Sequence, residues 1–346
     1  MNLKRTFYFL AYVVISLFIF SNTLIANQNS DGPVARSARQ NKTASLKAGL
    51  YNMTFKSKID GSPQPLKLKV PEGYLSEQKW PLLVTLHGLG DGPTIVPEID
   101  SMVQIGPYGR GDTSYEGIGE KDVFECIEFA KKLFSIDPNR IYLCGFSMGG
   151  QGTFKLGLQY PDMWAACVPV CGAIDHNNLY LIENGNNLPF WVNAGSIDEV
   201  VSAKFVKHIF DNATEFGYNH WKYTEHENMG HSFEIDWSNI EKWLLKQTRK
   251  TKPSHIIFNS DVPAKSYWLE IISKINEDEK ARIEAEITEQ KIIIKTNNIS
   301  DYQIYFDSAP IVPSRDVTIT ENGETIFHGK IISGDIFKKS ENNKVN

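Results

Sequence analysis

Four short apolar runs recur through the first 250 residues of the chain. They span residues 80–86, 140–144, 165–170 and 190–194. Runs of this length and apolar character are typical of parallel strands that are buried on both faces. Segments that can form amphipathic helices alternate with them, at residues 122–134, 151–159, 202–216 and 239–247. Strands that alternate with helices predict an α/β domain with a mostly parallel sheet flanked by helices.

A different pattern precedes the first of these runs. Residues 51–59 and 65–70 alternate between apolar and polar side chains, and the turn sequence Asp60-Gly61-Ser62-Pro63 separates them. This arrangement predicts two antiparallel strands. After residue 86, a stretch rich in Gly and Pro extends to about Gly119 and predicts a long loop.

The pattern changes again at Thr251-Lys252-Pro253-Ser254, after which no helical period appears. Short segments with strand character follow, at residues 255–258, 267–272, 281–287, 291–296, 302–306, 317–319 and 325–328. We therefore expect two domains. The first is an α/β domain over residues 49–250 that would carry the catalytic site, and the second is a small all-β, sandwich-like domain over residues 253–336. The charged residues 337–346 are expected to form a disordered tail.

The N-terminus has the layout of a secretory signal peptide. Lys4 and Arg5 precede an apolar run from Phe7 to Phe20, and the small residue Ala26 can mark a cleavage point. Residues 1–26 are therefore predicted to be a signal peptide, and the protein to be secreted or periplasmic, with no stable membrane span after cleavage. An uncleaved anchor extending to Ile25 is the alternative. Residues 27–48 are predicted to be a disordered leader.

Charge and cysteine content argue against nucleic acid as a partner and against disulfide bonds. The formal net charge of −5 and the lack of a basic patch argue against nucleic-acid binding. Cys167 and Cys171 are four residues apart on one face of a predicted strand, which is too far for a disulfide. We expect the four cysteines to be buried, reduced thiols. None has metal-site spacing with histidine, so no metal site is expected.

The strongest chemical signal is the sequence Gly145-Phe146-Ser147-Met148-Gly149. It follows an apolar run and precedes a segment that can be helical, which is the context of a nucleophile elbow. The turn would project the Ser147 hydroxyl beyond the carboxyl edge of the sheet. The backbone N–H of Met148, at the start of the helix, would then point toward a developing oxyanion. A tight turn without chemistry is the plainer alternative.

A serine nucleophile needs a base and an orienting carboxylate, in the chain order Ser, Asp or Glu, His. Asp198 follows the apolar run at 190–194, and His231 follows Gly230 beyond a last predicted strand at 221–225. Both lie at carboxyl ends of strands, where sites form in open α/β sheets. Asp198 could instead cap a helix, with Glu199 as a rival carboxylate. The rival histidines are His87, His176, His208, His220 and His226.

The second oxyanion donor is expected in the loop His87-Gly88-Leu89-Gly90, and we assign it to the N–H of Leu89. An ordinary glycine-rich loop is the alternative. Four aromatic residues are candidates for contact with substrate: Tyr108, Tyr115, Trp164 and Trp191. The two tyrosines lie on the long loop that follows the oxyanion strand. The tryptophans are equally suited to the core.

These segments together resemble the α/β-hydrolase superfamily over roughly residues 50–250. Further segments are similar to secreted polyhydroxybutyrate-depolymerase and feruloyl-esterase-like hydrolases, and to the related prolyl-oligopeptidase-like predicted peptidases: Pro71–Tyr74, Gly117–Val123 and Asp137–Arg140. The resemblance implies hydrolysis through a Ser-His-Asp triad and an acyl-enzyme, without a cofactor. The N-terminal segment is too short for the β-propeller that filters peptides in prolyl oligopeptidases, which favours an esterase.

We therefore predict an enzyme, a serine esterase, that cleaves carboxylic esters of the feruloyl, acetyl or polyester type. The substrate would be a free ester or one attached to a polysaccharide or polyester. Two alternatives stay open. One is a prolyl-oligopeptidase-like serine peptidase, and the other is a non-catalytic polymer-binding protein on a hydrolase scaffold, with the β-rich domain as the attachment module.

Overall fold

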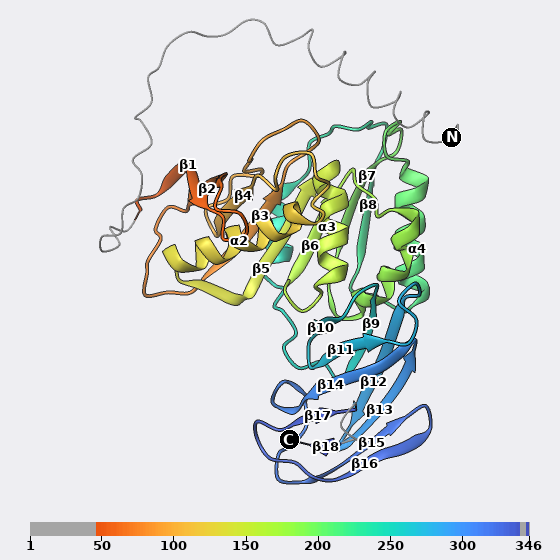
Figure 1. Cartoon of the computed structure of the whole chain (residues 1–346). Coiled ribbons are helices and arrows are strands. Elements are labelled where there is room, and N and C mark those ends of the chain that lie inside the picture. The colour runs from red at the N-terminus through yellow and green to blue at the C-terminus, as the bar shows by residue number, and fades with distance from the viewer. Residues whose placement is uncertain (1–45, 340–343, 346) are drawn as a thin grey trace, which may run out of the picture. The chain divides into compact units, whose positions relative to one another are not determined.

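A computed structural model describes residues 46–339, 344 and 345 of the chain (Figure 1). The predicted signal peptide lies outside the described residues, as does nearly all of the predicted leader. Within the described residues, no helix is long and apolar enough to cross a membrane.

The first part of the described chain is built on an eight-stranded sheet with the order β1-β2-β4-β3-β5-β6-β7-β8. β2 runs antiparallel to its neighbours β1 and β4, and the other adjacent pairs are parallel. The strands are β1 (Gly49–Lys56), β2 (Pro63–Val70), β3 (Trp80–Leu86), β4 (Val103–Pro107), β5 (Ile136–Phe146), β6 (Ala166–Val170), β7 (Trp191–Gly195) and β8 (Lys222–His226). The predicted mostly parallel α/β sheet is confirmed.

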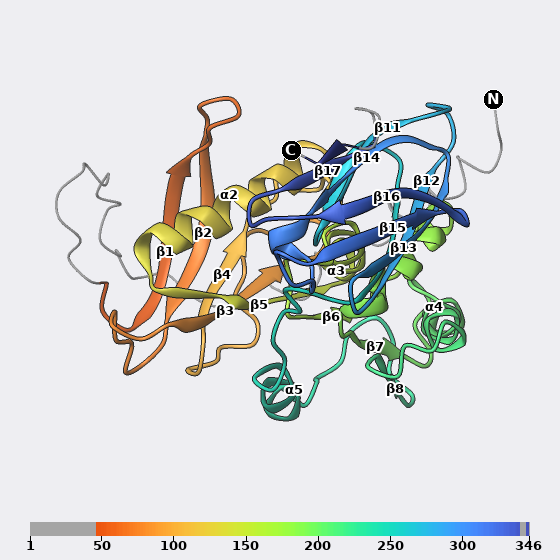
Figure 2. The same cartoon turned by 90° about the horizontal axis from the view of Figure 1, so that it is seen from below.

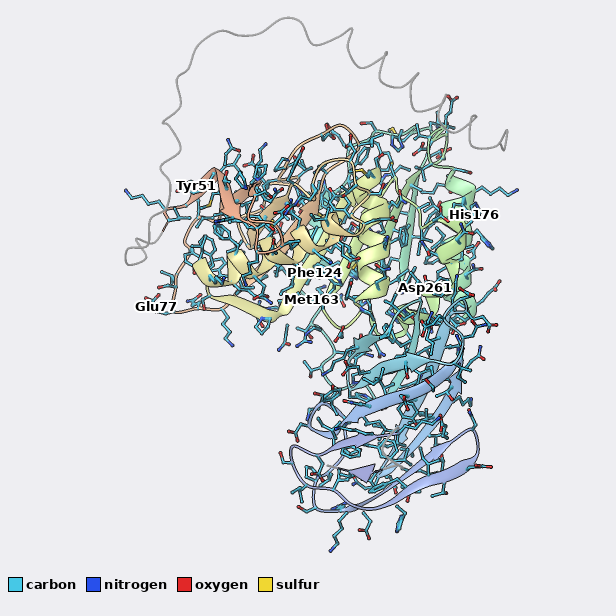
Figure 3. All side chains as sticks on the ribbon, in the orientation of Figure 1. Tyr51, Glu77, Phe124, Met163, His176 and Asp261 are labelled. Atoms are coloured by element: carbon cyan, nitrogen blue, oxygen red, sulfur yellow. The ribbon has the colours of Figure 1, made fainter. Side chains whose placement is uncertain are left out.

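Helices cover both faces of this sheet, as Figure 2 shows. α2 (Ile118–Leu133), α3 (Met148–Gln159) and α4 (Ala203–Glu215) lie on one face, and α5 (Trp237–Leu244) lies on the other. A 3₁₀ helix, η2 (His176–Asn187), connects β6 to β7. Phe124 on α2 packs edge-to-face on Tyr160, which caps α3, with ring centroids 4.8 Å apart; Phe124 is labelled in Figure 3. Each face of the sheet thus has its own apolar core.

One strand of the sheet was not predicted. β4 lies inside the segment that the sequence marks as a loop, and all five of its residues are buried. Val103, Gln104 and Ile105 pair with β3 on one side, and the strand pairs with β2 on the other. Its sequence includes Gly106 and Pro107, which are poor strand formers. Tertiary pairing, rather than local propensity, makes this segment a strand.

The second part of the described chain is all-β, as predicted. One of its sheets has the order β16-β15-β13-β12-β9, and the other has the order β10-β11-β14-β17-β18. The strands are β9 (His255–Ser260), β10 (Ala264–Ser266), β11 (Leu269–Lys274), β12 (Ala281–Thr288), β13 (Lys291–Asn297), β14 (Ile299–Tyr305), β15 (Asp316–Glu321), β16 (Glu324–Lys330), β17 (Ile336–Lys338) and β18 (Lys344–Val345). A short 3₁₀ helix, η3 (Phe306–Ser308), follows β14. Apolar side chains from both sheets form one common core.

The predicted boundary of the tail at residue 337 is wrong. Phe337 is fully buried in the core between the two sheets, and β17 pairs with β14 through Phe337 and Ile304. β18 in turn pairs with β17. A charged sequence suggested disorder here, but the one large apolar residue within it fixes the segment to the sheet.

Buried polar contacts join the two parts. Asn184 on η2 is fully buried and accepts a hydrogen bond from the backbone N–H of Asn259 on β9, at 2.7 Å. Its Nδ2 donates to the carbonyls of Leu158 and Asn259. Nearby, the hydroxyl of Tyr180 donates to Asp261, which is labelled in Figure 3.

Candidate active site

Ser147 occupies a sharp turn between β5 and α3. Its backbone has φ 57° and ψ −115°, a left-handed conformation that non-glycine residues rarely adopt. The strand and helix close on each other so tightly that a Cβ on Gly145 would lie 2.2 Å from the carbonyl oxygen of Gly149. A Cβ on Gly149 would lie 2.2 Å from the carbonyl oxygen of Leu86. Close packing therefore explains both glycines of the predicted elbow.

A continuous hydrogen-bonded chain links Ser147 to His231 and Asp198. Nε2 of His231 lies 2.8 Å from Oγ of Ser147, and Nδ1 lies 2.8 Å from Oδ2 of Asp198. Because a carboxylate oxygen can only accept, Nδ1 carries the ring hydrogen and Nε2 of the neutral ring accepts the serine hydroxyl hydrogen. The three predicted catalytic side chains are thus brought together in the order that a general base requires.

The loops that carry Asp198 and His231 are bonded to each other. The N–H of Ile197 donates to the carbonyl of Met229, and the N–H of Asn228 donates to Oγ of Ser196. Gly195 packs so closely on this second loop that a Cβ would lie 2.2 Å from the carbonyl oxygen of Gly230. His231 does not lie on a helix, because α5 begins only at Trp237. The contacts between the two loops therefore fix the separation of the Asp198 and His231 side chains.

Asp198 is held from both of its oxygens. Its Oδ1 accepts hydrogen bonds from the backbone N–H groups of Val200 and Val201, each at 2.8 Å, while Oδ2 faces His231. The Asp198 side chain has no exposed area. Its rival Glu199 is exposed to solvent. Of the two carboxylates, Asp198 is therefore the one that contacts His231.

The rival histidines have other partners or positions. His87 is buried, with its ring nitrogens 2.8 Å from the carbonyls of Gly88 and Tyr108. His220 faces the carbonyl of Gly185, and His226 faces Oδ1 of Asn193. His176 and His208 are exposed.

The predicted oxyanion donors lie on two sides of Ser147 in the fold. Met148 is the first residue of α3, where backbone N–H groups have no partner within the helix. Leu89 lies in the turn that follows β3, and its assignment stays a prediction. The turn is supported from behind, since the hydroxyl of Tyr115 donates to the carbonyl of His87 at 3.0 Å.

Two of the predicted substrate contacts are wrong. Tyr115 is fully buried and supports the His87 carbonyl, and burial raises the pKa of its hydroxyl. Trp164 is also buried, and its Nε1 donates to the carbonyl of Leu156. Both rings belong to the core.

The predicted substrate contact of Trp191 is also wrong. It begins β7, at the strand end opposite the catalytic loops. Its Nε1 donates to Oγ1 of Thr224, and its ring packs edge-to-face on Trp243. Tyr108 is half-buried on the loop after β4, and its role in binding substrate stays a prediction.

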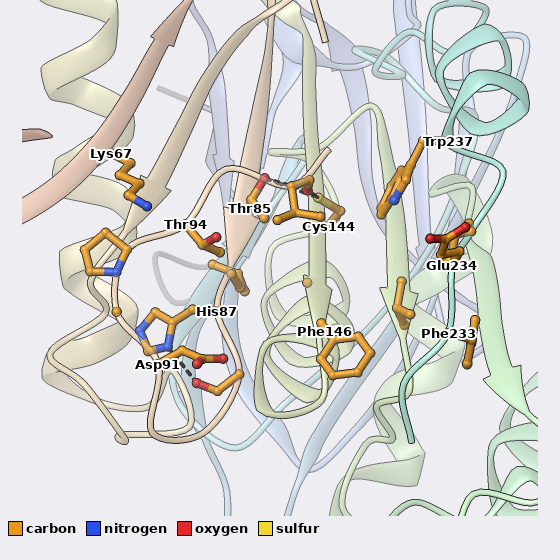
Figure 4. A pocket seen from close by; sticks show the side chains of 18 residues that line it. Lys67, Thr85, His87, Asp91, Thr94, Cys144, Phe146, Phe233, Glu234 and Trp237 are labelled. Atoms are coloured by element: carbon orange, nitrogen blue, oxygen red, sulfur yellow. Dashed lines mark hydrogen bonds between the residues drawn. The ribbon is translucent and has the colours of Figure 1, made fainter. Parts of the chain in front are cut away.

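A cavity of about 680 Å³ is lined by Phe146, which directly precedes Ser147 in the chain, but Ser147, Asp198 and His231 are not among its lining residues (Figure 4). Its lining includes Gly88 and Phe146, the residues next to Leu89 and Ser147 in the chain. Aromatic side chains from the segment after His231 line another side, at Phe233 and Trp237. The sequence did not reveal this cavity, because its walls come from five separate segments.

Exposed apolar side chains surround the catalytic residues. Leu89, Ile197, Val200 and Met229 are each at least 45% exposed. They belong to the loops that carry the predicted oxyanion donor, Asp198 and His231. These loops therefore expose apolar side chains as well as polar ones such as Glu199.

Potential metal ligands do come together here. In the described part of the chain, the one such group consists of Cys171, Asp198 and His231, whose ligand atoms lie within 4.8 Å of one another. The facing atoms of Asp198 and His231 are already hydrogen-bonded to each other. Cys171 is the site residue that sequence reasoning overlooked, although it ends a predicted strand at the edge where the catalytic loops begin.

Comparison with known proteins finds similarity to a protein family and to a curated protein. A model of the prolyl oligopeptidase family matches residues 108–204. A bifunctional acetylxylan esterase/xylanase of Neocallimastix patriciarum is 33% identical over 105 residues, which cover 27% of this chain and 16% of that protein. The match thus spans about a sixth of the length of that curated relative.

Among solved structures, a thermostable esterase is similar with a TM-score of 0.49 and 25% identity, covering 58% of this chain and 63% of its own. A ferulic acid esterase of the anaerobic fungus Anaeromyces mucronatus has a TM-score of 0.48 and 18% identity. That match covers 60% of this chain and 94% of the fungal chain.

Proposed function

We propose that this chain, a member of the α/β-hydrolase superfamily, hydrolyses carboxylic esters with Ser147 as its nucleophile. The observation that carries the proposal is the hydrogen-bonded chain from Asp198 through His231 to Ser147, with both links at 2.8 Å. The strained backbone of Ser147 supports it, since a residue in this conformation is typical of a functional turn.

The mechanism follows from the direction of the hydrogen bonds. His231 Nε2 takes the hydroxyl proton as Ser147 Oγ attacks the ester carbonyl, and the resulting imidazolium stays paired with Asp198. His231 then returns the proton to the alcohol that leaves, and an acyl group remains on Ser147. Water, activated by the same nitrogen, releases the acid and restores the serine.

The backbone N–H groups of Met148 and Leu89 would hold the oxyanion that forms on the substrate carbonyl. Such a donor typically contributes about 2.7–4 kcal/mol to the transition state. The close packing of Gly149 on Leu86 supports this role, because it brings the start of α3 against the strand from which the Leu89 turn begins.

We propose that the cavity next to Phe146 receives the acyl group of the ester, and its size favours a sizeable acyl group. A volume of about 680 Å³ falls in the range of ligand sites, which is about 300–1,000 Å³. An acetyl group would fill little of it, whereas a feruloyl or polyester acyl group would contact Phe146, Phe233 and Trp237. Within the feruloyl, acetyl and polyester range we therefore place the larger acyl groups first.

Peptide hydrolysis is the second candidate, and the match to the prolyl oligopeptidase family favours it. The matched residues include Ser147 and Asp198 but end before His231. Esters and amides can be compared directly on one enzyme preparation. We expect methyl ferulate and p-nitrophenyl esters to be cleaved, and proline-containing peptide amides not to be. Cleavage of the amides with a higher kcat/KM than the esters would overturn the esterase assignment.

We also propose that the chain acts outside the cytoplasm, on esters that are free or attached to a polysaccharide or polyester. This rests on the signal-like sequence at residues 1–26. Mass determination of the protein recovered from the culture medium or periplasm would test it, with a mature N-terminus close to Asn27 as the expected result.

A further inference from the structure

Cys171 lies at the triad although the proposed mechanism gives it no task. It follows β6 directly and is fully buried. Its Sγ, a carboxylate oxygen of Asp198 and a ring nitrogen of His231 all lie within 4.8 Å of one another. The other three cysteines of the chain are also buried and free, but they do not belong to this group of ligand atoms.

The backbone at Cys171 is held in an unusual conformation. Its φ of 46° is left-handed, and its N–H donates to the carbonyl of Asn193 on β7 at 2.9 Å. The next residue, Gly172, packs so closely on Gly150 of α3 that a Cβ would lie 2.3 Å from the backbone there. The chain is therefore fixed on both sides of Cys171, and its side chain is aimed at the end of β7 rather than along the face of β6.

Asp198 has one acceptor position that the hydrogen bonds described above leave open. A carboxylate offers about four lone-pair positions. Two are used on Oδ1 by Val200 and Val201, and one is used on Oδ2 by His231. The side chain has no exposed area, so no solvent reaches the fourth position. Cys171, whose Sγ lies within 4.8 Å of a carboxylate oxygen of Asp198, has a hydrogen to donate there.

The thiol is in the form that can donate. Burial, together with the nearby charge of Asp198, raises the pKa of Cys171 to about 12, so that at neutral pH it keeps its hydrogen. Sγ lies within 4.8 Å of a carboxylate oxygen of Asp198, and the nearby backbone of Gly195 also acts on the pKa of the thiol. Because S–H is a weak donor, the thiol can orient the Asp198 carboxylate without neutralising much of its negative charge. That charge then still stabilises the protonated ring of His231.

We propose that Cys171 is a positioning residue that donates its thiol hydrogen to Asp198 and keeps this carboxylate aligned with His231. This inference rests on the proposed function, because alignment matters only if the triad is catalytic. Cys171 acts on the reaction through Asp198 and does not touch the substrate. Its loss should therefore change kcat and leave KM nearly constant.

The test compares Cys171→Ala, which removes the donor, with Cys171→Ser, which keeps one. Cys167→Ala is the matched control, because Cys167 is a buried thiol on the same strand, β6, at a position away from the triad. Each full-length variant is assayed with a p-nitrophenyl ester, and its midpoint of urea unfolding is measured.

We expect Cys171→Ala to lower kcat about threefold to tenfold, the effect of losing one neutral hydrogen bond, with KM unchanged. Cys171→Ser should recover at least half of the wild-type kcat, and Cys167→Ala should keep it. Equal kcat for Cys171→Ala and wild type would overturn the inference alone. An equal loss of kcat in Cys171→Ala and Cys167→Ala would overturn it as well, by assigning the effect to packing. A wild-type protein without Ser147-dependent hydrolysis would overturn the proposed function and this inference with it.

Discussion

Oδ2 of Asp198 lies 2.8 Å from Nδ1 of His231, and the two residues come from loops that are themselves hydrogen-bonded to each other. The carboxylate therefore decides which ring nitrogen carries the hydrogen. If it could also donate, the ring could adopt the other tautomer and Nε2 would no longer accept from Ser147.

Replacing Asp198 with Asn should for this reason abolish most of the activity. We expect kcat for ester hydrolysis to fall about 10⁴-fold while the fold is retained, since an amide has the shape of the carboxylate. Steady-state kinetics with a p-nitrophenyl ester measure the loss. Glu199→Gln is the matched control and should keep wild-type activity, because Glu199 is exposed. A large loss in Glu199→Gln with little loss in Asp198→Asn would reverse the assignment.

The close packing at the turn that carries Ser147 gives a second prediction, which concerns Gly149. A Cβ added there would meet the carbonyl oxygen of Leu86 at 2.2 Å, and backbone atoms on both sides cannot move away easily. We expect Gly149→Ala to lower the free energy of unfolding by about 1–3 kcal/mol, and to lower kcat because the N–H of Met148 shifts with α3. Urea unfolding and kinetics measure the two effects.

Gly92→Ala is the control for this substitution. Nothing lies within 4 Å of a Cβ at Gly92. It should leave the free energy of unfolding close to that of the wild-type protein, and it controls for stability alone because Gly92 lines the cavity. Equal free energies of unfolding in the two variants would mean that the strand and helix are not as closely packed as described.

The contact between Asn184 and Asn259 gives a third prediction. Asn184→Ala leaves the buried N–H of Asn259 without its acceptor and two carbonyls without their donor. We expect a loss of about 1–3 kcal/mol in the free energy of unfolding. Asn177→Ala, an exposed position in the same 3₁₀ helix, should change it by less than about 0.5 kcal/mol. Equal midpoints of urea unfolding for these two variants would contradict the structure at this contact.

The partial burial of His220 predicts how the free energy of unfolding depends on pH. Burial lowers the pKa of His220 below its usual value of 6.5, aided by the charge of Lys250 and opposed by the carbonyl of Gly185. The unfolded chain then binds a proton that the folded chain resists, so stability is lost as pH falls through about 6.5. The urea midpoint should be lower at about pH 5.5 than at about pH 7.5.

His220→Gln isolates this contribution. Its amide can still donate to the carbonyl of Gly185, but it does not titrate near neutral pH. We expect a smaller difference between the two midpoints in this variant. Some difference should remain, because burial also lowers the pKa of His226. An unchanged difference would show that His220 does not resist protonation in the folded protein.

The apolar runs made the central strands and helices predictable. The run at residues 80–86 coincides with β3. Ser147, Asp198 and His231 were predicted to lie close together because each follows a strand at its carboxyl end, and the three side chains are hydrogen-bonded to one another in sequence. Free, buried cysteines were also predicted correctly. In these cases the information lies in the local pattern, so one sequence was sufficient.

Features set by tertiary packing were missed. β4 is a strand only because β2 and β3 pair with both of its edges. Tyr115 and Trp164 were taken as possible substrate contacts, but the aromatic character of a residue does not tell whether its ring faces a cleft or the core. Cys171 belongs to the site through its position beside β7, a relationship between strands that are 20 or more residues apart in the chain.

The central claim is that Ser147 is a nucleophile activated by His231, and covalent labelling tests it most directly. The folded wild-type protein would be treated with a fluorophosphonate, and the modified residue would be located by mass spectrometry. We predict one adduct, on Ser147, that inactivates the esterase in proportion to labelling, with no adduct on Ser147→Ala. A folded wild-type protein that takes up no label, or takes it up at another residue while Ser147→Ala keeps its activity, would contradict the account.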